Sequence, residues 1–537
     1  MNPTPLLVHV SKRLKGGYLV DLRILEEMIR RMAGIIPLNN LTSEQIEGSA
    51  GGSVLRQQVL AAIGDERKEK HASLLRLVNS MLEADLLTPF AVLIAQARQR
   101  CIFTVDEQDS QLKLLSNMFD ECQAMLCQFV ELITMNSVEE SCIEKIPDLS
   151  LLFGEFGLDP SVSFYLCRPK NRLRIQQIHQ KEEEEKMDIG ENVKTNGTAL
   201  EAPQYTSTLT ENVLEVFPSE YWQCFTPHFY ATFWQLSLYD LAVPISRYSE
   251  EQKKLSDLGR TFGDRTRQRT EIEGLMNKLA AESKIQMIHY QETRARLVVE
   301  SQQWFDVDSV REKGLSPRVE IIEEVLQACI YPRVLFGPED AVFCVKFIKQ
   351  LHLFGTPHFS TLTFFDRIFS SQAASMIFIC TEREAENYGR FLAEILWDFS
   401  QWRINETFYK KDMLGKNMIG FRTKWDQDEL LQPNQFRTVM KKWHTKLEEA
   451  ITLCLESQEY MHIRNAIIVM DSICNAFPIL DEHGVALMKT LEEVKDAEKR
   501  EDLKIRLATI MSVLGRTKRK WVDKARFLDV RSYLKYF

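Results

Sequence analysis

The stretch TEREAENYGRFLAEILWDF, residues 381–399, shows most directly what kind of fold this chain forms. It opens with Thr381 followed three residues later by Glu384, a capping-box pattern in which each side chain can satisfy a backbone N–H group of the other residue. The stretch therefore predicts the start of an amphipathic helix. Its apolar residues recur every three or four positions and so share one helical face: Ala385, Tyr388, Leu392, Leu396 and Phe399.

The segments on either side carry equally clear helix signals. Pro338 follows Gly337 and precedes two acidic residues, which predicts the first turn of a helix that Gly355 ends. The dipeptide Thr356-Pro357 predicts the start of the next helix. Two further amphipathic patterns follow, and Pro478 stops the second: Phe436, Val439, Met440, Trp443, Leu447, Ile451 and Cys454, then Ile463, Ile467, Met470 and Ile473.

Gly389 stands in the middle of the first of these helices. A glycine inside a helix costs about 1 kcal/mol relative to alanine. A helix tolerates that cost where a neighbouring backbone comes close. We therefore predict that Gly389 is a close-packing site.

Residues 1–180 are also predicted to be a helical region with short connections. Residues 181–211 differ, because they begin with a run of four glutamates and their first 24 residues, KEEEEKMDIGENVKTNGTALEAPQ, contain no aromatic side chain. Such a segment cannot bury enough apolar surface to offset the entropy of ordering it. We predict an acidic disordered linker that divides the chain in two, with an acidic interaction tail as the alternative.

Residues 212–315 combine an aromatic-rich block with a long charged segment. Aromatic residues at helical spacing usually form a core, and use at an interface is the alternative for 217–239. In residues 250–305 an apolar heptad seam breaks down because polar residues fall on it, so one long, partly exposed helix is predicted rather than a coiled coil. The apolar members are Ile272, Leu275, Met276 and Leu279, and the polar ones are Glu282, Gln286 and His289.

Residues 316–515 are predicted to be a helical-repeat domain, followed by a basic C-terminal end at 516–537. No alternating β pattern of useful length and no fixed-period sequence repeat occurs. The predicted fold class is therefore all-α, an irregular α-solenoid of stacked antiparallel helices.

The composition narrows the class of protein. The 537 residues carry a formal net charge of −9, so the chain as a whole does not attract nucleic acid or acidic membranes, although a local patch can. The eleven cysteines include no C-x-x-C pair and are predicted to be buried, reduced thiols. No uninterrupted apolar run exceeds six residues, which predicts a soluble protein of a reducing compartment.

The search for catalytic motifs is negative. The chain lacks the glycine-rich phosphate loops, the H-E-x-x-H zinc motif and the G-x-S-x-G nucleophile motif. His352 and His358 flank a turn, but no third metal ligand is evident beside them. We therefore predict that the chain is not an enzyme and holds no cofactor or metal.

Two clusters suggest binding instead. The basic end surrounds Trp521 with cations, a pattern typical of single-stranded nucleic acid binding, although a solvated basic helix end and a nuclear address are alternatives. The segment from His462 to Asn465, with Trp443-His444 upstream, interleaves polar and core positions. It predicts either buried hydrogen bonding that sets the helix register or an exposed docking face. The possible RNA contacts are Arg516, Lys518, Arg519, Lys520 and Trp521.

Several long phrases, in order, resemble the THO complex subunit 2 family over roughly residues 217–510. They are PHFYATFWQLSLYDLAVP (227–244), PRVLFGPEDAVFCVKFIKQLH (332–352), TPHFSTLTFFDRIF (356–369), CTEREAENYGRFLAEIL (380–396) and WHTKLEEAITLCLESQEYMHIRNAIIVM (443–470). Family members extend further, into a long basic tail. The chain is therefore expected to be a fragment or a divergent short form.

The resemblance implies a non-enzymatic scaffold of the nuclear THO/TREX assembly, which couples transcription to messenger-RNA processing and export. It implies a MIF4G-like middle domain in which residues 320–475 hold a DEAD-box RNA helicase, with other THO subunits as further partners and the nucleus as the location. No membrane or small-molecule partner is expected. The candidate partner-binding residues are Asp366, Arg367, Glu384, Arg390, His444, His462 and Arg464. The competing hypothesis is a helical-repeat adaptor outside RNA biology.

Overall fold

The computed structural model is all-α, as predicted, over the residues that it describes. Two isolated bridge pairs, Arg422 with Leu430 and Leu480 with Val522, are the extended pairings found there. Cysteine behaves as predicted too, since nine of the eleven are buried and none is disulfide-bonded. The described residues are 2–35, 41–61, 67–103, 112–134, 140–188, 204–261, 266–305, 317–415, 417–423 and 429–529.

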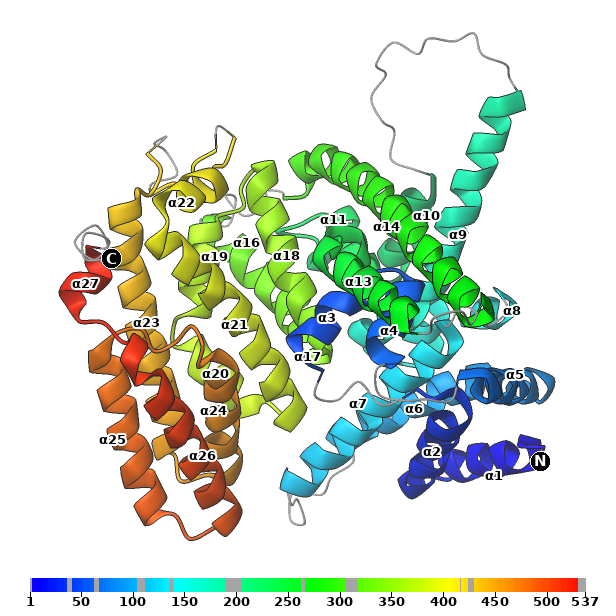
Figure 1. Ribbon diagram of the computed structural model, residues 1–537, viewed down its shortest axis with the longest axis horizontal. Helices are drawn as coiled ribbons and strands as arrows, with labels where there is room; N and C mark the ends of the chain where they lie inside the picture. The colour runs from blue at the N-terminus through cyan, green and yellow to red at the C-terminus, as the bar shows by residue number, and fades with distance from the viewer. Residues whose placement is uncertain are drawn as a thin grey trace. The chain divides into compact units, whose positions relative to one another are not determined.

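The chain forms two compact units (Figure 1). The first unit comprises Met1–Trp222 and Pro227–Glu300, and the second unit comprises Gln223–Thr226 and Ser301–Phe537. The first unit therefore runs across the predicted linker instead of ending there. The predicted domain boundaries remain predictions, because compactness alone does not test them.

The predicted linker 181–211 is helical at both ends, which corrects the expectation for those residues. Helix α9 continues to Asp188, and α10 begins at Gln204. Residues 189–203 lie outside the described residues, so the linker remains a prediction there.

The first unit is a stack of helices whose aromatic block forms a core, as predicted. The Trp234 ring stacks on Phe164 with 5.8 Å between ring centroids, and Tyr230 contacts both Phe164 and Phe217 edge-on. Its helices are α1 Thr4–Lys15, α2 Leu22–Ala33, α3 Ser43–Ser49, α4 Ser53–Ala61, α5 Arg67–Glu83, α6 Leu87–Phe103, α7 Leu112–Thr134, α8 Glu140–Glu144, α9 Pro160–Asp188, α10 Gln204–Val216, α11 Pro227–Gln235, α12 Leu238–Leu241, α13 Ile245–Thr261 and α14 Thr266–Glu300.

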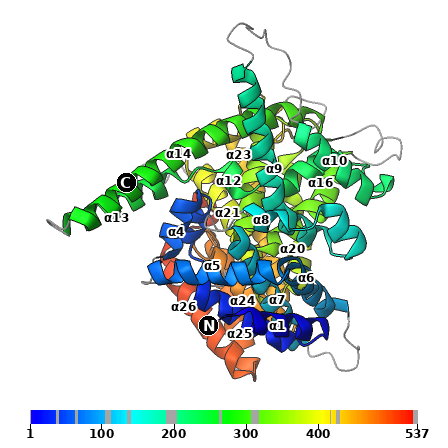
Figure 2. The same ribbon diagram turned by 90° about the vertical axis from the view of Figure 1, so that its right-hand side faces the viewer.

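The charged segment 250–305 is not one helix, so that prediction was wrong. Helices α13 and α14 run side by side as an antiparallel hairpin (Figure 2). Leu279 of α14 packs with Leu255 and Tyr248 of α13 in a small core. The segment folds back on itself because α13 covers the apolar residues of the seam on α14.

The helix signals of the second unit are mostly confirmed. Helix α18 starts at Pro338 and ends where Gly355 adopts the left-handed conformation at φ 63°. Its helices are α16 Pro317–Val325, α17 Tyr331–Phe336, α18 Pro338–Phe354, α19 Thr361–Ile368, α20 Gln372–Ile379, α21 Glu382–Ile404, α22 Glu406–Met413, α23 Pro433–Glu456, α24 Tyr460–Ile473, α25 Asp481–Ala497, α26 Glu501–Thr517 and α27 Lys524–Leu528.

The start predicted at Thr356-Pro357 was wrong. Residues 356–360 form a turn, and Ser360 caps α19 by accepting a hydrogen bond from the Thr363 backbone N–H at 3.2 Å. A serine at this position stabilises the helix start, because its side-chain oxygen accepts from a backbone N–H group that has no partner within the helix.

Helices α21 and α24 pack closely in the second unit, as predicted from Gly389. A Cβ atom added at Gly389 would lie 2.8 Å from the Ser472 Cβ and 3.2 Å from the Val469 Cα. Ten residues further along α21, Phe399 stacks on Trp443 of α23 with 5.0 Å between the ring centroids. The absence of a side chain at Gly389 thus lets two helix backbones approach.

Over the described residues, no single helix is long and apolar enough to cross a membrane. One pair, Ala72–Glu83 with Leu87–Phe103, reaches the required length and composition only together, and its two helices are bent by 91°.

Candidate partner-docking surface

The predicted partner-binding residues lie on four helices of the second unit. The structure divides them into surface and interior positions, so they do not form one face. Asp366 and Arg367 lie on α19, Glu384 and Arg390 on α21, His444 on α23, and His462 and Arg464 on α24.

Arg464 is fully buried in a polar network. Its Nε and Nη2 atoms donate to the Asn465 side-chain oxygen at 3.2 and 3.0 Å. The Asn465 amide in turn donates to the backbone carbonyls of Ile377 and Cys380 at 3.0 and 2.6 Å. For Arg464 and Asn465 the structure therefore favours the first of the two hypotheses, because these two residues fix α24 against the end of α20.

The same network reaches the surface through Glu382, a residue that the sequence did not single out. One Glu382 oxygen lies 3.5 Å from Arg464 and the other accepts from Arg506 of α26 at 2.7 Å. A carboxylate in the first turn of α21 is favourable for the helix alone. Its link to Arg506 could not be foreseen, because 124 residues separate the two.

His444 is also buried, which corrects its assignment as a partner contact. Its ring lies against Phe477 at 5.2 Å and Phe527 of α27 at 5.8 Å. Neither ring nitrogen has a hydrogen-bond partner within the described part of the chain. Burial lowers the pKa of His444 to about 3, so the ring is neutral at physiological pH.

Two α19 residues remain at the surface, half-exposed and already paired. Asp366 accepts from the Lys442 ammonium at 2.7 Å and from the Trp443 indole at 3.1 Å. Arg367 forms an ion pair with Glu323 at 3.1 Å. These pairs are compatible with a surface contact, because half-exposed ion pairs contribute little stability and can exchange partners.

Helix α21 presents a half-exposed ridge, here called the α21 ridge. Its charged part includes Arg390, and its C-terminal part includes Trp397, whose side chain is 56% exposed. Sequence reasoning missed Trp397. Its exposure could have been predicted, because position 397 does not belong to the apolar pattern from Ala385 to Phe399. The α21 ridge consists of Arg383, Glu386, Arg390, Glu394, Trp397, Gln401 and Ile404.

Glu384 and His462 are the last two candidates. Glu384 accepts from the Thr381 backbone N–H at 2.9 Å, so its carboxylate is used in the predicted capping box. The half-exposed His462 ring lies 4.3 Å from the Phe378 ring. Glu384 therefore has a structural role, whereas His462 keeps part of its surface accessible.

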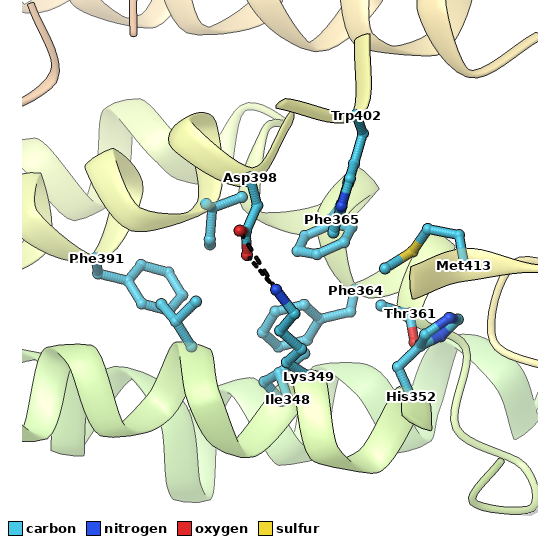
Figure 3. A pocket seen from close by; sticks show the side chains of 12 residues that line it. Ile348, Lys349, His352, Thr361, Phe364, Phe365, Phe391, Asp398, Trp402 and Met413 are labelled. Atoms are coloured by element: carbon cyan, nitrogen blue, oxygen red, sulfur yellow. Dashed lines mark hydrogen bonds and ion pairs between the residues drawn. The ribbon is translucent and has the colours of Figure 1, made fainter. Parts of the chain in front are cut away.

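A cavity of about 20 Å³ lies between α18, α19 and α21 (Figure 3). It has room for about one water molecule, whereas small-molecule sites occupy hundreds of Å³. Lys349 pairs with Asp398 at its edge at 3.3 Å, and burial lowers the pKa of His352 to about 4. The cavity is too small for a substrate. The lining residues are Val345, Ile348, Lys349, His352, Thr361, Phe364, Phe365, Phe391, Ile395, Asp398, Trp402 and Met413.

The described residues contain no group of three or more His, Cys, Asp or Glu side chains placed to hold a metal ion. His352, the buried member of the histidine pair, instead shares a hydrogen bond with the Thr361 hydroxyl at 3.0 Å.

In the basic C-terminal end the cationic side chains are exposed to solvent, whereas Trp521 is partly buried. Four exposed cations lie at the end of α26 and in the following turn, and none forms an ion pair within the described ranges. Trp521 is half-buried, and a Cβ at Gly484 would lie 2.5–2.6 Å from three atoms of its ring. One ring face is therefore used for packing and is not available to a base. The four cations are Arg516, Lys518, Arg519 and Lys520.

The chain is similar to proteins of one family. The family model described as Transcription factor/nuclear export subunit protein 2 matches residues 222–514. The chain is 33% identical to THO complex subunit 2 of Homo sapiens over 519 residues (93% of this chain, 32% of the relative) and 30% identical to that of Arabidopsis thaliana over 555 residues (97% and 30%). It is 25% identical to that of Saccharomyces cerevisiae over 509 residues (94% and 28%). The chain thus spans about a third of the length of these relatives.

Proposed function

The chain belongs to the THO complex subunit 2 family, and on that premise we propose that it is a non-enzymatic scaffold subunit of the nuclear THO/TREX complex. In this role it holds other THO subunits and a DEAD-box RNA helicase, and so links transcription to messenger-RNA processing and export. The family match supports this role over an adaptor outside RNA biology.

The observation that supports the proposal is that the second unit uses its buried polar residues for helix packing and leaves other polar groups at its surface. The buried polar network around Arg464 sets the packing of helices, and the cavity beside α21 is too small for a substrate. The groups left for function are surface groups on helices. That distribution favours protein binding over catalysis.

The α21 ridge is the proposed docking surface for the helicase, and His462 of α24 and the Asp366–Arg367 pair of α19 are proposed as separate contacts outside it. A partner that must release in each ATPase cycle is better held by charged and half-exposed residues than by a large apolar patch. Stimulation of its ATPase requires only that the scaffold bind one arrangement of the two helicase lobes more tightly than the others.

The test measures helicase binding and ATPase rate with residues 1–537 carrying Arg390→Glu and Trp397→Ala together. We expect binding to weaken about tenfold or more, as for loss of a central contact. The matched control is Lys489→Glu with Val485→Ala, a cation and an apolar residue exposed on α25. If the wild-type chain is folded yet neither binds nor stimulates the helicase, this role lies elsewhere in the assembly.

A second function, RNA binding, is proposed for the four cations of the basic end. None of them has an acidic partner among the described residues, which favours contact with phosphate groups, and such binding depends on salt. Replacing all four with glutamate should abolish binding of a single-stranded RNA and leave helicase binding unchanged. Trp521→Leu should matter less, because one face of the ring packs on Gly484. Equal RNA binding by the four-site variant would contradict the assignment.

A further inference from the structure

Between the buried Leu279 and Leu297, the inward face of helix α14 is largely polar. The face that packs against its own unit carries the buried Gln286 and Thr293 and the half-buried Glu282. The opposite face carries isoleucines and a valine. A surface helix ordinarily does the opposite, with apolar residues inward and polar residues outward.

The inward polar residues are explained by contacts within the unit. Glu282 accepts from the backbone N–H groups of Val54 and Leu55 at 2.8 and 3.0 Å, at the start of α4. The Gln286 amide donates to the Ala50 carbonyl at 2.7 Å. A carboxylate at a helix N-terminus is favourable, so this face is polar because it holds the loop before α4.

The outward apolar residues have no such explanation. Ile285, Ile288 and Val299 have 62, 56 and 51% of their surface exposed. Together with Ala281, Glu292 and Ala295, which are also exposed, they follow the 4-3-4-3-4 spacing of the a and d positions of a coiled coil. We call this face the outer stripe. It consists of Ala281, Ile285, Ile288, Glu292, Ala295 and Val299.

The charges on either side of Ala281 and Ile285 are positive, and Glu292 is the acidic residue of the stripe itself. Lys278 and Lys284 are exposed and lie about 60° to either side of it around the helix, at 100° per residue. Neither lysine forms an ion pair with any described residue. A second copy of this chain is disfavoured, because an antiparallel pairing centred on the stripe would bring Glu292 against Ile288, and a parallel pairing in register would bring Glu292 against Glu292.

We propose that the outer stripe of α14 binds an amphipathic helix of a partner protein, with aliphatic residues at heptad spacing flanked by acidic residues. The aliphatic residues of that helix cover Ile285 and Ile288, and its acidic residues pair with Lys278 and Lys284. The proposal concerns the first unit, so it is independent of the helicase surface on the second.

The test uses two synthetic peptides of about four heptads, with isoleucine at a and leucine at d. One carries glutamate at every e and g position and the other lysine, so neither associates with itself strongly. Fluorescence anisotropy with residues 1–537 should show binding of the glutamate peptide, weakened by salt, and at least about tenfold weaker binding of the lysine peptide.

Two variants locate the binding. Ile285→Asp with Ile288→Asp should weaken binding of the glutamate peptide about tenfold or more, while Lys278→Glu with Lys284→Glu should make the chain prefer the lysine peptide. These positions are exposed, so the fold is expected to persist, which circular dichroism checks. Ile505→Asp, at a position 66% exposed on α26, is the matched control and should bind like the wild type.

The proposal is overturned if the glutamate peptide does not bind, if both peptides bind equally, or if the Ile285 and Ile288 variant binds like the control. It is also overturned if light scattering shows a dimer that the same variant dissociates, because the occupant is then a second copy.

Discussion

The α21–α24 pair of the second unit and the α13–α14 hairpin of the first follow opposite rules. In α21 the residues at helical spacing, from Ala385 to Phe399, are all buried, and Gly389 allows the closest approach. In α14 the inner face is largely polar between Leu279 and Leu297, and Ile285 and Ile288 face outward.

The difference shows what an apolar pattern measures. In α21 the apolar positions are the buried ones, because that face of the helix packs against other helices. In α14 polar residues are buried instead, because they form hydrogen bonds with backbone groups at the start of α4 and in the loop before it. Four substitutions test this contrast, and they follow from the largest expected effect to the smallest.

Gly389→Leu should lower the free energy of unfolding by about 3 kcal/mol, because the new side chain collides with Ser472 and the α24 backbone. Urea unfolding of residues 1–537 measures the change. Gly515→Leu on α26 is the control, since a Cβ there meets nothing within 4 Å. It should be neutral or raise stability by up to about 1 kcal/mol. Equal losses for both variants would show that α21 and α24 are not closely packed.

Asn465→Leu should cost about 2 to 3 kcal/mol, because it leaves the Ile377 and Cys380 carbonyls unsatisfied and removes the nearest partner of Arg464. The same unfolding experiment measures it. Thr509→Ala, which removes an exposed hydrogen bond on α26, should change stability by less than about 0.5 kcal/mol. A harmless Asn465→Leu would mean that the buried network does not hold α24.

His444 makes the second unit sensitive to acid. Its pKa is lowered by burial to about 3 in the folded state, whereas an unfolded histidine titrates near 6.5. The unfolded chain therefore binds the proton first as pH falls below 6.5, and stability drops by about 2 kcal/mol between pH 7 and 5 from this residue. In His444→Leu this part of the slope should vanish, while the curves run parallel above pH 7. An unchanged slope would place the ring in contact with water.

Tyr248→Phe should cost only about 1 kcal/mol, since it removes one hydroxyl from the contact between α13, α14 and the loop before α4. That hydroxyl accepts from the Gly52 N–H at 2.9 Å and lies 3.1 Å from Glu282. Hydrogen exchange should become faster at Gly52 in particular. Tyr460→Phe, which removes an exposed bond to Asp502, is the control and should leave stability within a few tenths of a kcal/mol. Unchanged exchange at Gly52 would show that Glu282 and Gln286 hold the loop alone.

The sequence by itself determined the all-α class, the capping box at Thr381, the helix end at Gly355 and the close approach at Gly389. These features depend on residues three or four positions apart, or on one residue that must lack a side chain, so they can be read locally. The family resemblance could also be recognised from the sequence, because several long stretches occur in the order found in the family.

Only the tertiary structure decided which polar residues are buried. The sequence suggested that Arg464 and His444 are available to a partner. In the structure Arg464 is bound by Asn465 and Glu382. The His444 ring is covered by Phe477 and Phe527. The outward turn of Ile285 and Ile288 was decided in the same way, by a loop more than 200 residues earlier. Whether a helical face is covered depends on which distant segment packs against it, and helical periodicity carries no information about that segment.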